Sequence, residues 1–327
     1  FRRVLFRSDL VFLPTGNTST DFFGGLRDNL DYYSSSVVAL RASTGELVWH
    51  FQMVHHDVWD YDTPAQPTLF TFERDGKKIP ALAQPTKMGH LFLLDRLTGK
   101  PLFPVEERPV SQGWEVPGEH LSPTQPFPTK PAPLHPGGIK PEDAWGFTFW
   151  DKGACRKLIE STHNDGIFTP PSLQGSAFFP SDFGGNNWGT PAIDPARGLI
   201  ILNTLFMPST LTLVPREQCQ IGKDQFTAPQ LETPYCVKVQ PMLSPLGVPC
   251  SAPPWGSLTA IDMHTGDKRW EVPLGTLEEM APWPVSMIKG APNIGGPSVS
   301  AAGLTFIAAT PDMYLRAFDS ETGEELW

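Results

Sequence analysis

The chain has 327 residues, a net charge of −10 and 18% charged residues. It has no basic patch typical of nucleic-acid binding, because its densest basic run, Arg2 to Arg7, lies at the extreme terminus. The 36 Pro, 29 Gly, 10 Trp and 21 Phe favour a turn-rich, aromatic-rich β protein over a helical one. No apolar run reaches the roughly 18 residues that span a bilayer.

The first residues differ from the rest of the chain. Residues 1–9 form a short arginine-rich lead that matches nothing downstream, and we interpret it as a candidate cloning or assembly artefact. The strand-like stretch LVFLPTGN follows from Leu10, where we expect the folded domain, residues 10–327, to begin. The chain stops inside a repeat, so we expect it to be a fragment of a longer protein.

Four segments share one pattern of alternating apolar residues, a Thr-Gly turn and then an apolar residue or Trp. The threonines of these turns are at positions 44, 98, 265 and 322, so the middle interval is about three times the others and could hide further units. Alternation predicts two-faced strands, and Gly after Thr accepts the positive φ of a tight hairpin turn. A period near 50 residues is typical of a propeller blade, in which stacked sheets bury both faces. We expect the recurring Trp49, Trp270 and Trp327 to pack one blade against the next.

The stretch VHHDVWDYDTPAQP, residues 54–67, carries two histidines and three aspartates in positions 55 to 62. A metal site, an acid/base cluster and a polar turn are all compatible with this composition. Adjacent histidines on a strand point to opposite faces, so His55 and His56 do not easily bind one ion. We expect Asp57 and Asp62 to cap turns or to pair with nearby charges.

Two regions are rich in proline, and we expect loop insertions near residues 106–145 and 206–255. Proline lacks the backbone N–H group that donates a hydrogen bond to the neighbouring strand. The stretches 126–145 and 234–255 are therefore interpreted as packed loops over a rim of the propeller rather than as strands. The four cysteines form no C-x-x-C motif, which disfavours a zinc ribbon or a thioredoxin-type centre. One disulfide among Cys219, Cys236 and Cys250 is compatible with an oxidising compartment, and buried free thiols are the alternative.

These segments together resemble the quinoprotein dehydrogenases that use pyrroloquinoline quinone (PQQ), and among them the membrane-bound glucose/quinate/shikimate type. The resemblance runs from about Leu10 to Trp327 and rests on motifs that include HHDVWDYDTPAQPTL, PTKMGHLFLLDRLTGK, GGNNWGTPAIDP and LSPLGVPCSAPPWGSLTAID. It implies an all-β fold: an eight-bladed propeller, of which this chain would hold roughly five blades.

The resemblance also assigns roles to single residues. Asp60 matches the family's catalytic base, which would remove the hydroxyl proton of an alcohol while PQQ takes the hydride. Lys87 matches a cation beside the quinone oxygens, and Asn187 and Trp188 match an element that reaches the cofactor or substrate. Asn17 matches an amide oxygen ligand of the divalent cation, Ca or Mg. His55 or His56 is expected to line the substrate pocket or to orient Asp60.

For each residue a plainer interpretation stays open: a turn aspartate for Asp60, a surface lysine for Lys87 and a Gly-Asn turn for Asn17. Asn187 stands where some glucose-type members are acidic, which leans the substrate toward quinate, shikimate or another polyol. Ile294 stands where the alcohol branch commonly has a Trp, which favours the glucose/quinate branch. The resemblance implies ubiquinone as electron acceptor, the periplasmic face of the bacterial inner membrane, and an anchor outside this chain. A non-catalytic propeller scaffold and a metal-dependent hydrolase built on His55–Asp62 are the competing hypotheses.

Overall fold

The computed structural model describes residues 9–113, 116–223 and 225–327, so most of the lead, residues 1–8, lies outside the described part. Almost all of its regular structure is strand, and every pairing between named strands is antiparallel. The α-helix that it describes is α2 (Phe149–Glu160), and four short 3-10 helices cover Leu30–Tyr33, Pro141–Asp143, Arg216–Gln218 and Val285–Met287. No helix in this part of the chain is both long and apolar enough to cross a membrane.

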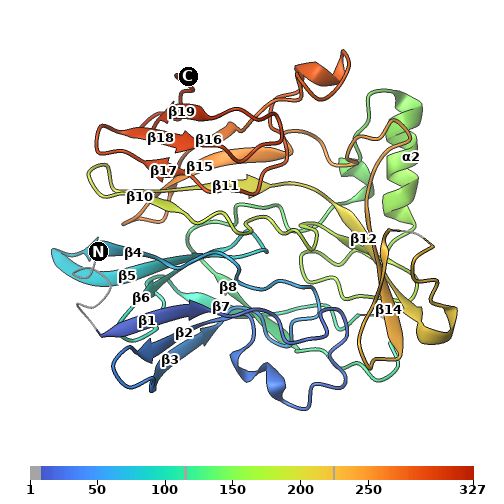
Figure 1. Ribbon diagram of the computed structural model, residues 1–327, viewed down its shortest axis with the longest axis horizontal. Coiled ribbons are helices and arrows are strands. Elements are labelled where there is room, and N and C mark those ends of the chain that lie inside the picture. The colour runs from blue at the N-terminus through green and yellow to red at the C-terminus, as the bar shows by residue number, and fades with distance from the viewer. Residues whose placement is uncertain (1–8, 114–115, 224) are drawn as a thin grey trace.

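Four sheets have the blade pattern and follow one another in chain order, from blue to red in Figure 1. The first is β1 (Leu10–Pro14), β2 (Ser36–Arg41) and β3 (Leu47–Gln52), and the second is β4 (Thr68–Arg74), β5 (Lys77–Pro85) and β6 (Leu91–Asp95). The third contains β10 (Ala192–Asp194), β11 (Leu199–Leu205), β15 (Gly256–Asp262) and β16 (Lys268–Pro273). The fourth contains β17 (Ser298–Val299), β18 (Leu304–Ile307) and β19 (Arg316–Asp319).

The long interval between the second and third Thr-Gly turns holds insertions rather than further blades in the described residues. A hairpin of β7 (Val105–Pro109) and β8 (Thr124–Pro128) follows the second blade. A separate sheet has the order β13 (Thr227–Pro229), β14 (Tyr235–Pro241), β12 (Ser209–Pro215) and β9 (Ser176–Phe178). The described residues thus carry four blade sheets and one inserted sheet where we expected about five blades.

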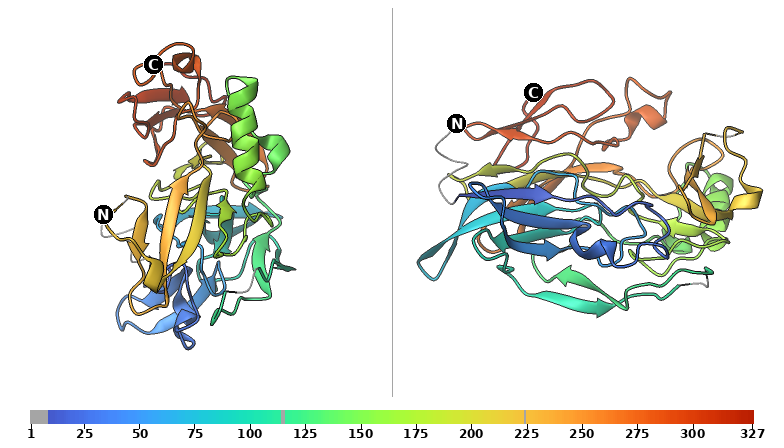
Figure 2. Two further views of the ribbon diagram at one scale, coloured as in Figure 1. Left: turned by 90° about the vertical axis from the view of Figure 1, so that its right-hand side faces the viewer. Right: turned by 60° about the horizontal axis from the view of Figure 1, so that its bottom comes forward.

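The inserted sheet corrects the expectation that the proline-rich stretch 234–255 is a loop, because this stretch contains β14, which pairs with β12 over seven residues. The stretch 126–145 contains the end of β8 and the 3-10 helix Pro141–Asp143, and it is otherwise without strands, as expected. Pro215, Pro229 and Pro241 stand at strand ends. Proline costs few ladder bonds at such positions, so it does not prevent pairing. Figure 2 shows β12, β14 and α2 together at one end of the molecule, away from the blade sheets.

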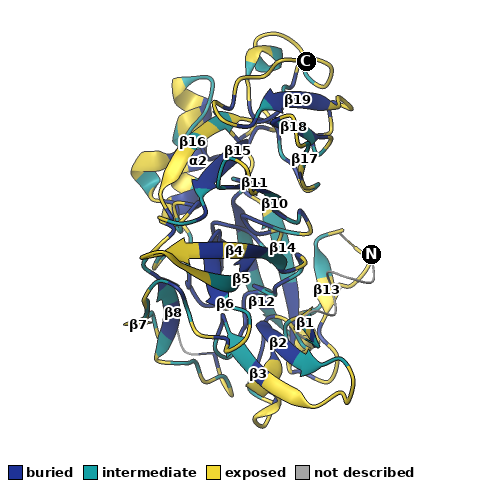
Figure 3. Cartoon of the chain, turned by 90° about the vertical axis from the view of Figure 1, so that its left-hand side faces the viewer, coloured by how far each residue is buried: buried dark blue, intermediate teal, exposed yellow. Residues whose placement is uncertain are grey.

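In the third blade the buried residues lie mainly on the central strands. Every residue of β11 is buried, whereas the edge strand β16 alternates between exposed and half-buried positions, as Figure 3 shows. The pattern of β16 agrees with the predicted two-faced strands, whereas β11 is buried on both faces, as is common for strands covered on both sides.

The tryptophans that recur in the repeat pack one blade against the next. The Trp49 indole donates to Arg96 O at 3.1 Å, and the Trp270 indole donates to Ser320 O at the same distance. Each ring lies on the Thr-Gly turn of the following blade, at Gly99 and Gly323 respectively. The predicted packing role is confirmed for Trp49 and Trp270, whereas Trp327 is 73% exposed.

We expect Gly99→Ala to destabilise the fold much more than Gly45→Ala. Both glycines occupy Thr-Gly turns with similar positive φ, +72° and +77°, which costs an Ala side chain about 1–2 kcal/mol. A Cβ at Gly99 would lie 2.7 Å from the Trp49 ring, whereas nothing lies within 4 Å at Gly45. The clash should add about 1–3 kcal/mol. Urea unfolding measures the free energy of unfolding of both variants. Equal losses of stability would show that the Trp49 contact does not constrain the turn.

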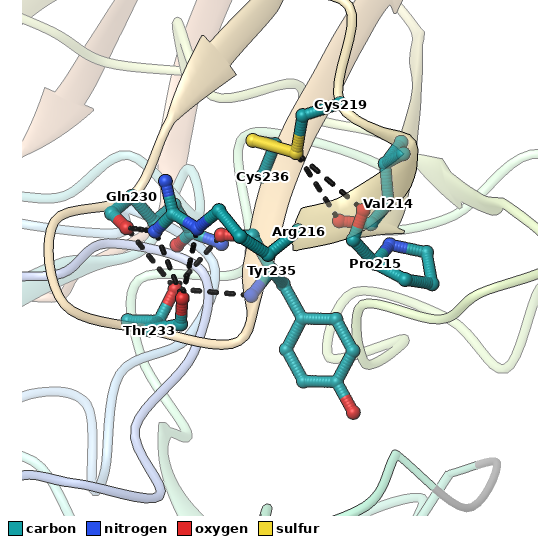
Figure 4. The surroundings of a disulfide bond; sticks show 8 residues. All are labelled: Val214, Pro215, Arg216, Cys219, Gln230, Thr233, Tyr235 and Cys236. Atoms are coloured by element: carbon teal, nitrogen blue, oxygen red, sulfur yellow. Dashed lines mark hydrogen bonds between the residues drawn. A yellow bond between two sulfur atoms is a disulfide. The ribbon is translucent and has the colours of Figure 1, made fainter.

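Two disulfides join all four cysteines. Cys219–Cys236 closes a separation of 17 residues inside the inserted sheet, beside Arg216, which donates to Thr233 O (Figure 4). Cys155–Cys250 spans 95 residues and fastens α2 to the segment that leads into β15. The prediction of a disulfide among the last three cysteines is confirmed by Cys219–Cys236, and the free-thiol alternative is wrong.

We expect removal of the Cys155–Cys250 disulfide to lower the stability of the protein while leaving the structure of the blades unchanged. Replacing both cysteines by Ser should lower the free energy of unfolding by about 2–5 kcal/mol, because a long loop is released in the unfolded chain. The matched control replaces Cys219 and Cys236, whose shorter loop should cost less. Thermal unfolding with and without reductant measures both, and an unchanged Tm in the Cys155/Cys250 variant would contradict the expectation.

Candidate active site

The loop that presents Asp60 is built around a buried aspartate. Asp57 is fully buried, and its Oδ1 accepts from the backbone N–H groups of Trp59 at 2.9 Å and Tyr61 at 3.1 Å. Its Oδ2 accepts from the Ser35 hydroxyl at 2.6 Å. These bonds satisfy the carboxylate and fix the turn, so the predicted capping role of Asp57 is confirmed.

The aromatic residues on either side of Asp60 anchor the loop in the core. The Trp59 indole donates to Thr169 O at 2.7 Å, and the Tyr61 hydroxyl donates to Pro180 O at 2.9 Å. Asp60 lies between these two side chains with φ of 58°, in the left-handed region. Its carboxylate therefore faces away from the core, into the cavity described below.

Lys87 lies between two carboxylates. Its Nζ is 2.9 Å from Asp60 Oδ2 and 2.6 Å from Asp62 Oδ1, and the residue is only 6% exposed. Lys87 is thus not a surface lysine, and the expected charge pairing of Asp62 is confirmed. The position just after β5 explains the burial, because the loop from Ser181 to Gly185 covers the lysine: a Cβ at Gly184 would lie 2.5 Å from the Lys87 side chain.

The charges of this cluster are unequal, with two carboxylates and one ammonium in direct contact. Burial raises the pKa of Asp60 to about 8, although the charge of Lys87 acts in the opposite direction. Burial acts to lower the pKa of Lys87, but attraction to Asp60 and Asp62 outweighs it and raises the pKa. Lys87 therefore stays charged near neutral pH, and Asp60 is the group that can exchange a proton there.

Asp60 lines a cavity of about 950 Å³ between the blades and the inserted sheet. Two further aspartates line it, Asp21 and Asp182, and burial raises the pKa of each. The opposite wall is formed by Asn293, Ile294 and the segment from Ala308 to Pro311 of the fourth blade. The cavity thus combines apolar walls with three acidic groups around one buried lysine.

The remaining predicted residues lie on neighbouring segments without a described contact to Asp60 or Lys87. The Asn17 amide donates to Asp21 O at 3.1 Å, and its Oδ1 is buried without a partner. The Asn187 amide donates to Phe183 O at 2.7 Å, and its Oδ1 is also buried and unpartnered. Trp188 is 71% exposed.

His55 and His56 are directed away from the Asp60 cavity, whose lining includes neither. His55 Nδ1 lies 2.7 Å from Gln52 Oε1, and its Nε2 lies 3.1 Å from Glu107. His56 borders a different cavity, where Nδ1 lies 2.7 Å from Asp31 and Nε2 lies 3.1 Å from Glu119. Burial acts to lower the pKa of His56, but the hydrogen bonds to the two carboxylates raise it to about 9. The two histidines do point to different partners, as expected, although they lie in a bend rather than a strand.

Sequence reasoning missed Asp21 and Asp182 in the cavity, and Glu119 and His120 beside His56. Asp182 stands five positions before Asn187 in the same glycine-rich segment, which is the signal that could have found it. Glu119 and His120 lie in a stretch without periodicity, so only the fold brings them to His56.

Comparison with known protein families identifies the family to which the chain belongs. Residues 7–327 match the family described as "PQQ: Glucose/ethanol/alcohol dehydrogenase, beta-propeller domain". The chain belongs to this family. The predicted all-β quinoprotein propeller is thereby confirmed.

Curated relatives at about 40% identity are named as dehydrogenases of glucose, quinate/shikimate and glycerol. The chain is 41% identical to the quinoprotein glucose dehydrogenase of Escherichia coli (strain K12), over 98% of this chain and 42% of that protein. It is also 41% identical to the quinate/shikimate dehydrogenase (quinone) of Acinetobacter baylyi, over 97% of this chain and 41% of that protein. The chain thus spans less than half of these relatives.

Among solved structures, a europium-containing methanol dehydrogenase superposes with a TM-score of 0.60 at 21% identity, over 98% of this chain and 44% of that one. Quinohemoprotein alcohol dehydrogenase from Comamonas testosteroni superposes with a TM-score of 0.59 at 21% identity, over 97% of this chain and 38% of that one. At this identity the likeness shows the fold alone.

The residues present fit the cofactor and cation of the PQQ family. Among the predicted site residues, Asn17 and Asn187 each have a side-chain amide oxygen that is buried without a partner. An orphaned amide oxygen carries a desolvation cost that a hard cation or a donor group would remove. Lys87 supplies a buried positive charge suited to an anionic, quinone-bearing ligand.

Proposed function

We propose that this chain carries part of the active site of a PQQ-dependent dehydrogenase that oxidises a sugar or cyclic polyol, with Asp60 as general base. The observation that carries the proposal is the contact at 2.9 Å between the buried Lys87 and Asp60, which lines the cavity. A base with a pKa of about 8 is near the optimum for accepting a proton at neutral to slightly alkaline pH.

The proposed roles follow from the cluster of charges. Asp60 accepts the proton of the substrate hydroxyl, which requires its carboxylate within hydrogen-bond reach of that oxygen. Lys87 stays charged and anchored by Asp62, so it can leave Asp60 and donate to a ligand oxygen without losing all of its buried partners. Asn17 and Asn187 are proposed to hold the cation and the cofactor through their free oxygens. Bound PQQ would supply the hydride acceptor, and a divalent cation held beside it would supply a Lewis acid.

The proposed substrate class rests on the relatives and on the acidic wall. Relatives at about 40% identity are named for glucose, quinate/shikimate and glycerol. Asp21 and Asp182 can accept hydrogen bonds from a polyhydroxylated molecule that enters beside Asp60. Asn187, where some glucose-type members carry an acid, favours quinate, shikimate or another polyol over glucose.

We further propose ubiquinone as the electron acceptor and the periplasmic face of the bacterial inner membrane as the location, with an anchor outside this chain. Two disulfides in a chain of this size support an oxidising compartment. A relative named as a quinone-dependent dehydrogenase supports the acceptor class.

The test is a dye-reduction assay on the complete enzyme, reconstituted with PQQ and either Ca²⁺ or Mg²⁺. Quinate, shikimate, glucose and glycerol are offered in parallel. Reduction that requires both PQQ and the cation is the expected result, and the preferred substrate defines the branch. A folded protein that reduces no dye with any of them would instead support the non-catalytic scaffold. Activity that is lost on zinc removal and is indifferent to PQQ would support the hydrolase.

The raised pKa of Asp60 predicts the pH dependence of the reaction. The base must be deprotonated, so kcat/KM should rise about tenfold per pH unit below pH 8 and level off above it. The profile of the free enzyme is measured by dye reduction across neutral and alkaline pH. A profile that is flat between about pH 5 and pH 9 would remove Asp60 from the base role.

A further inference from the structure

We propose that His56, Glu119 and His120 form a binding site for a divalent transition metal of the zinc class. Each residue offers one ligand atom, and these atoms all lie within 4.8 Å of one another. Two imidazoles and one carboxylate are a ligand set that zinc and cobalt accept, leaving a position for water. The site is separate from the Asp60 cavity, and the inference does not depend on the proposed function.

The contacts direct these ligand atoms toward one point. His56 Nε2 lies 3.1 Å from Glu119 Oε1, and the rings of His56 and His120 lie with their centroids 4.6 Å apart and their planes tilted by 35°. The other oxygen of Glu119 accepts from Gly24 N at 2.6 Å, which fixes the carboxylate. Its Oε1 faces the histidines and also accepts from the backbone N–H of His120 at 2.9 Å. Gly24 is required here, because a Cβ would lie 2.2 Å from His56 Nε2.

A fourth residue orients the first histidine from behind. Asp31 Oδ2 lies 2.7 Å from His56 Nδ1, and the other oxygen of the same carboxylate, Oδ1, lies 3.5 Å from Arg27. A carboxylate on the far nitrogen of a ligating histidine sets its tautomer and raises its basicity, so Nε2 is left for the metal. This partner lies outside the ligand triad, and metal-binding histidines almost always have such a partner.

The site is accessible from solvent. His56 and His120 border a cavity of about 210 Å³ that Asp31, Gln52 and Tyr32 also line. His120 is exposed, so an ion can enter without opening the core. A bound ion would clamp the segment around Glu119 to the loop that begins at His56 and presents Asp60, which is a structural rather than a catalytic role.

The experiment titrates Co²⁺ into the complete enzyme after chelator treatment and records the visible absorption. Nitrogen ligands in a four- or five-coordinate site give an intense band, whereas an oxygen-rich octahedral cofactor site gives a weak one. We expect one equivalent with the intense band, displaced by Zn²⁺. His120→Ala and Glu119→Gln should each lower the affinity at least about tenfold, and Asp31→Asn about 10–100-fold.

His55→Ala is the matched control, since His55 is the adjacent histidine and contacts Gln52 and Glu107 instead. It should bind Co²⁺ like the wild type. Because metal and proton compete for Nε2, the titration is repeated at higher pH, and circular dichroism checks that each variant is folded. Absence of the intense band in the wild type, or an unchanged band in folded His120→Ala, would overturn the inference.

Discussion

Asp60→Asn should reduce kcat by about 10²–10⁴-fold while the protein stays folded. The two side chains have nearly the same shape, but the amide cannot accept the hydroxyl proton. General-base catalysis typically contributes about 10²–10⁴-fold to the rate, which is the loss expected here. The variant removes no core contact, because Asp60 faces the cavity. Steady-state dye reduction with saturating substrate measures the loss, and circular dichroism checks the fold.

The control for this variant is Asp62→Asn. Asp62 is in the same loop and contacts the same lysine at 2.6 Å, but it is not part of the cavity lining. If the proton transfer depends on Asp60 itself, Asp62→Asn should lose much less activity, about tenfold at most. Equal losses of activity in the two variants would mean that a negative charge beside Lys87 is needed rather than a base at Asp60. Normal activity in Asp60→Asn would show that Asp60 is not the general base.

Lys87→Ala should weaken cofactor retention and lower kcat by about 10²–10³-fold, the usual effect of deleting a donor aimed at developing charge. The substitution also removes the positive charge that holds down the pKa of Asp60, so that pKa should rise further above 8. The midpoint of the kcat/KM profile should therefore move to higher pH. PQQ binding by fluorescence and the pH profile together measure these effects.

Lys130→Ala is the matched control for Lys87→Ala. Lys130 also contacts an aspartate, Asp267, at 2.7 Å, but this pair is on the surface. It should leave activity, PQQ binding and the pH profile unchanged, since exposed ion pairs contribute little. Unchanged cofactor binding and an unshifted pH midpoint in Lys87→Ala would leave Lys87 with no role beyond pairing the two aspartates.

The repeat pattern predicted the blades well because it depends on local chemistry. The Thr-Gly turns are observed with Gly45, Gly99, Gly266 and Gly323 at φ between +72° and +77°. Each glycine N–H bonds to the carbonyl four residues earlier, as in Gly99 to Asp95 at 2.8 Å. Turn geometry and strand alternation require only neighbouring residues, so a single sequence contains that information.

The inserted sheet was missed because proline content was given more weight than alternation. β12 and β14 are far apart in sequence, and their pairing is supported by tertiary contacts and by Cys219–Cys236. A proline at the end of a strand removes almost no inter-strand hydrogen bonding. Whether a proline stands at such an end depends on the partner strand, which the sequence does not identify.

The sequence by itself determined the propeller family and the blade strands, and it indicated that Asp57 and Asp62 either cap turns or pair with charges. Only the tertiary structure decided that Lys87 is buried between Asp60 and Asp62, and that His55 and His56 point away from that cavity. It also decided that Glu119 and His120 meet His56. The physical reason is that periodicity and turns are set by residues a few positions apart. Burial, pKa and the meeting of distant side chains instead depend on how separate sheets and loops pack, and no local pattern encodes that packing.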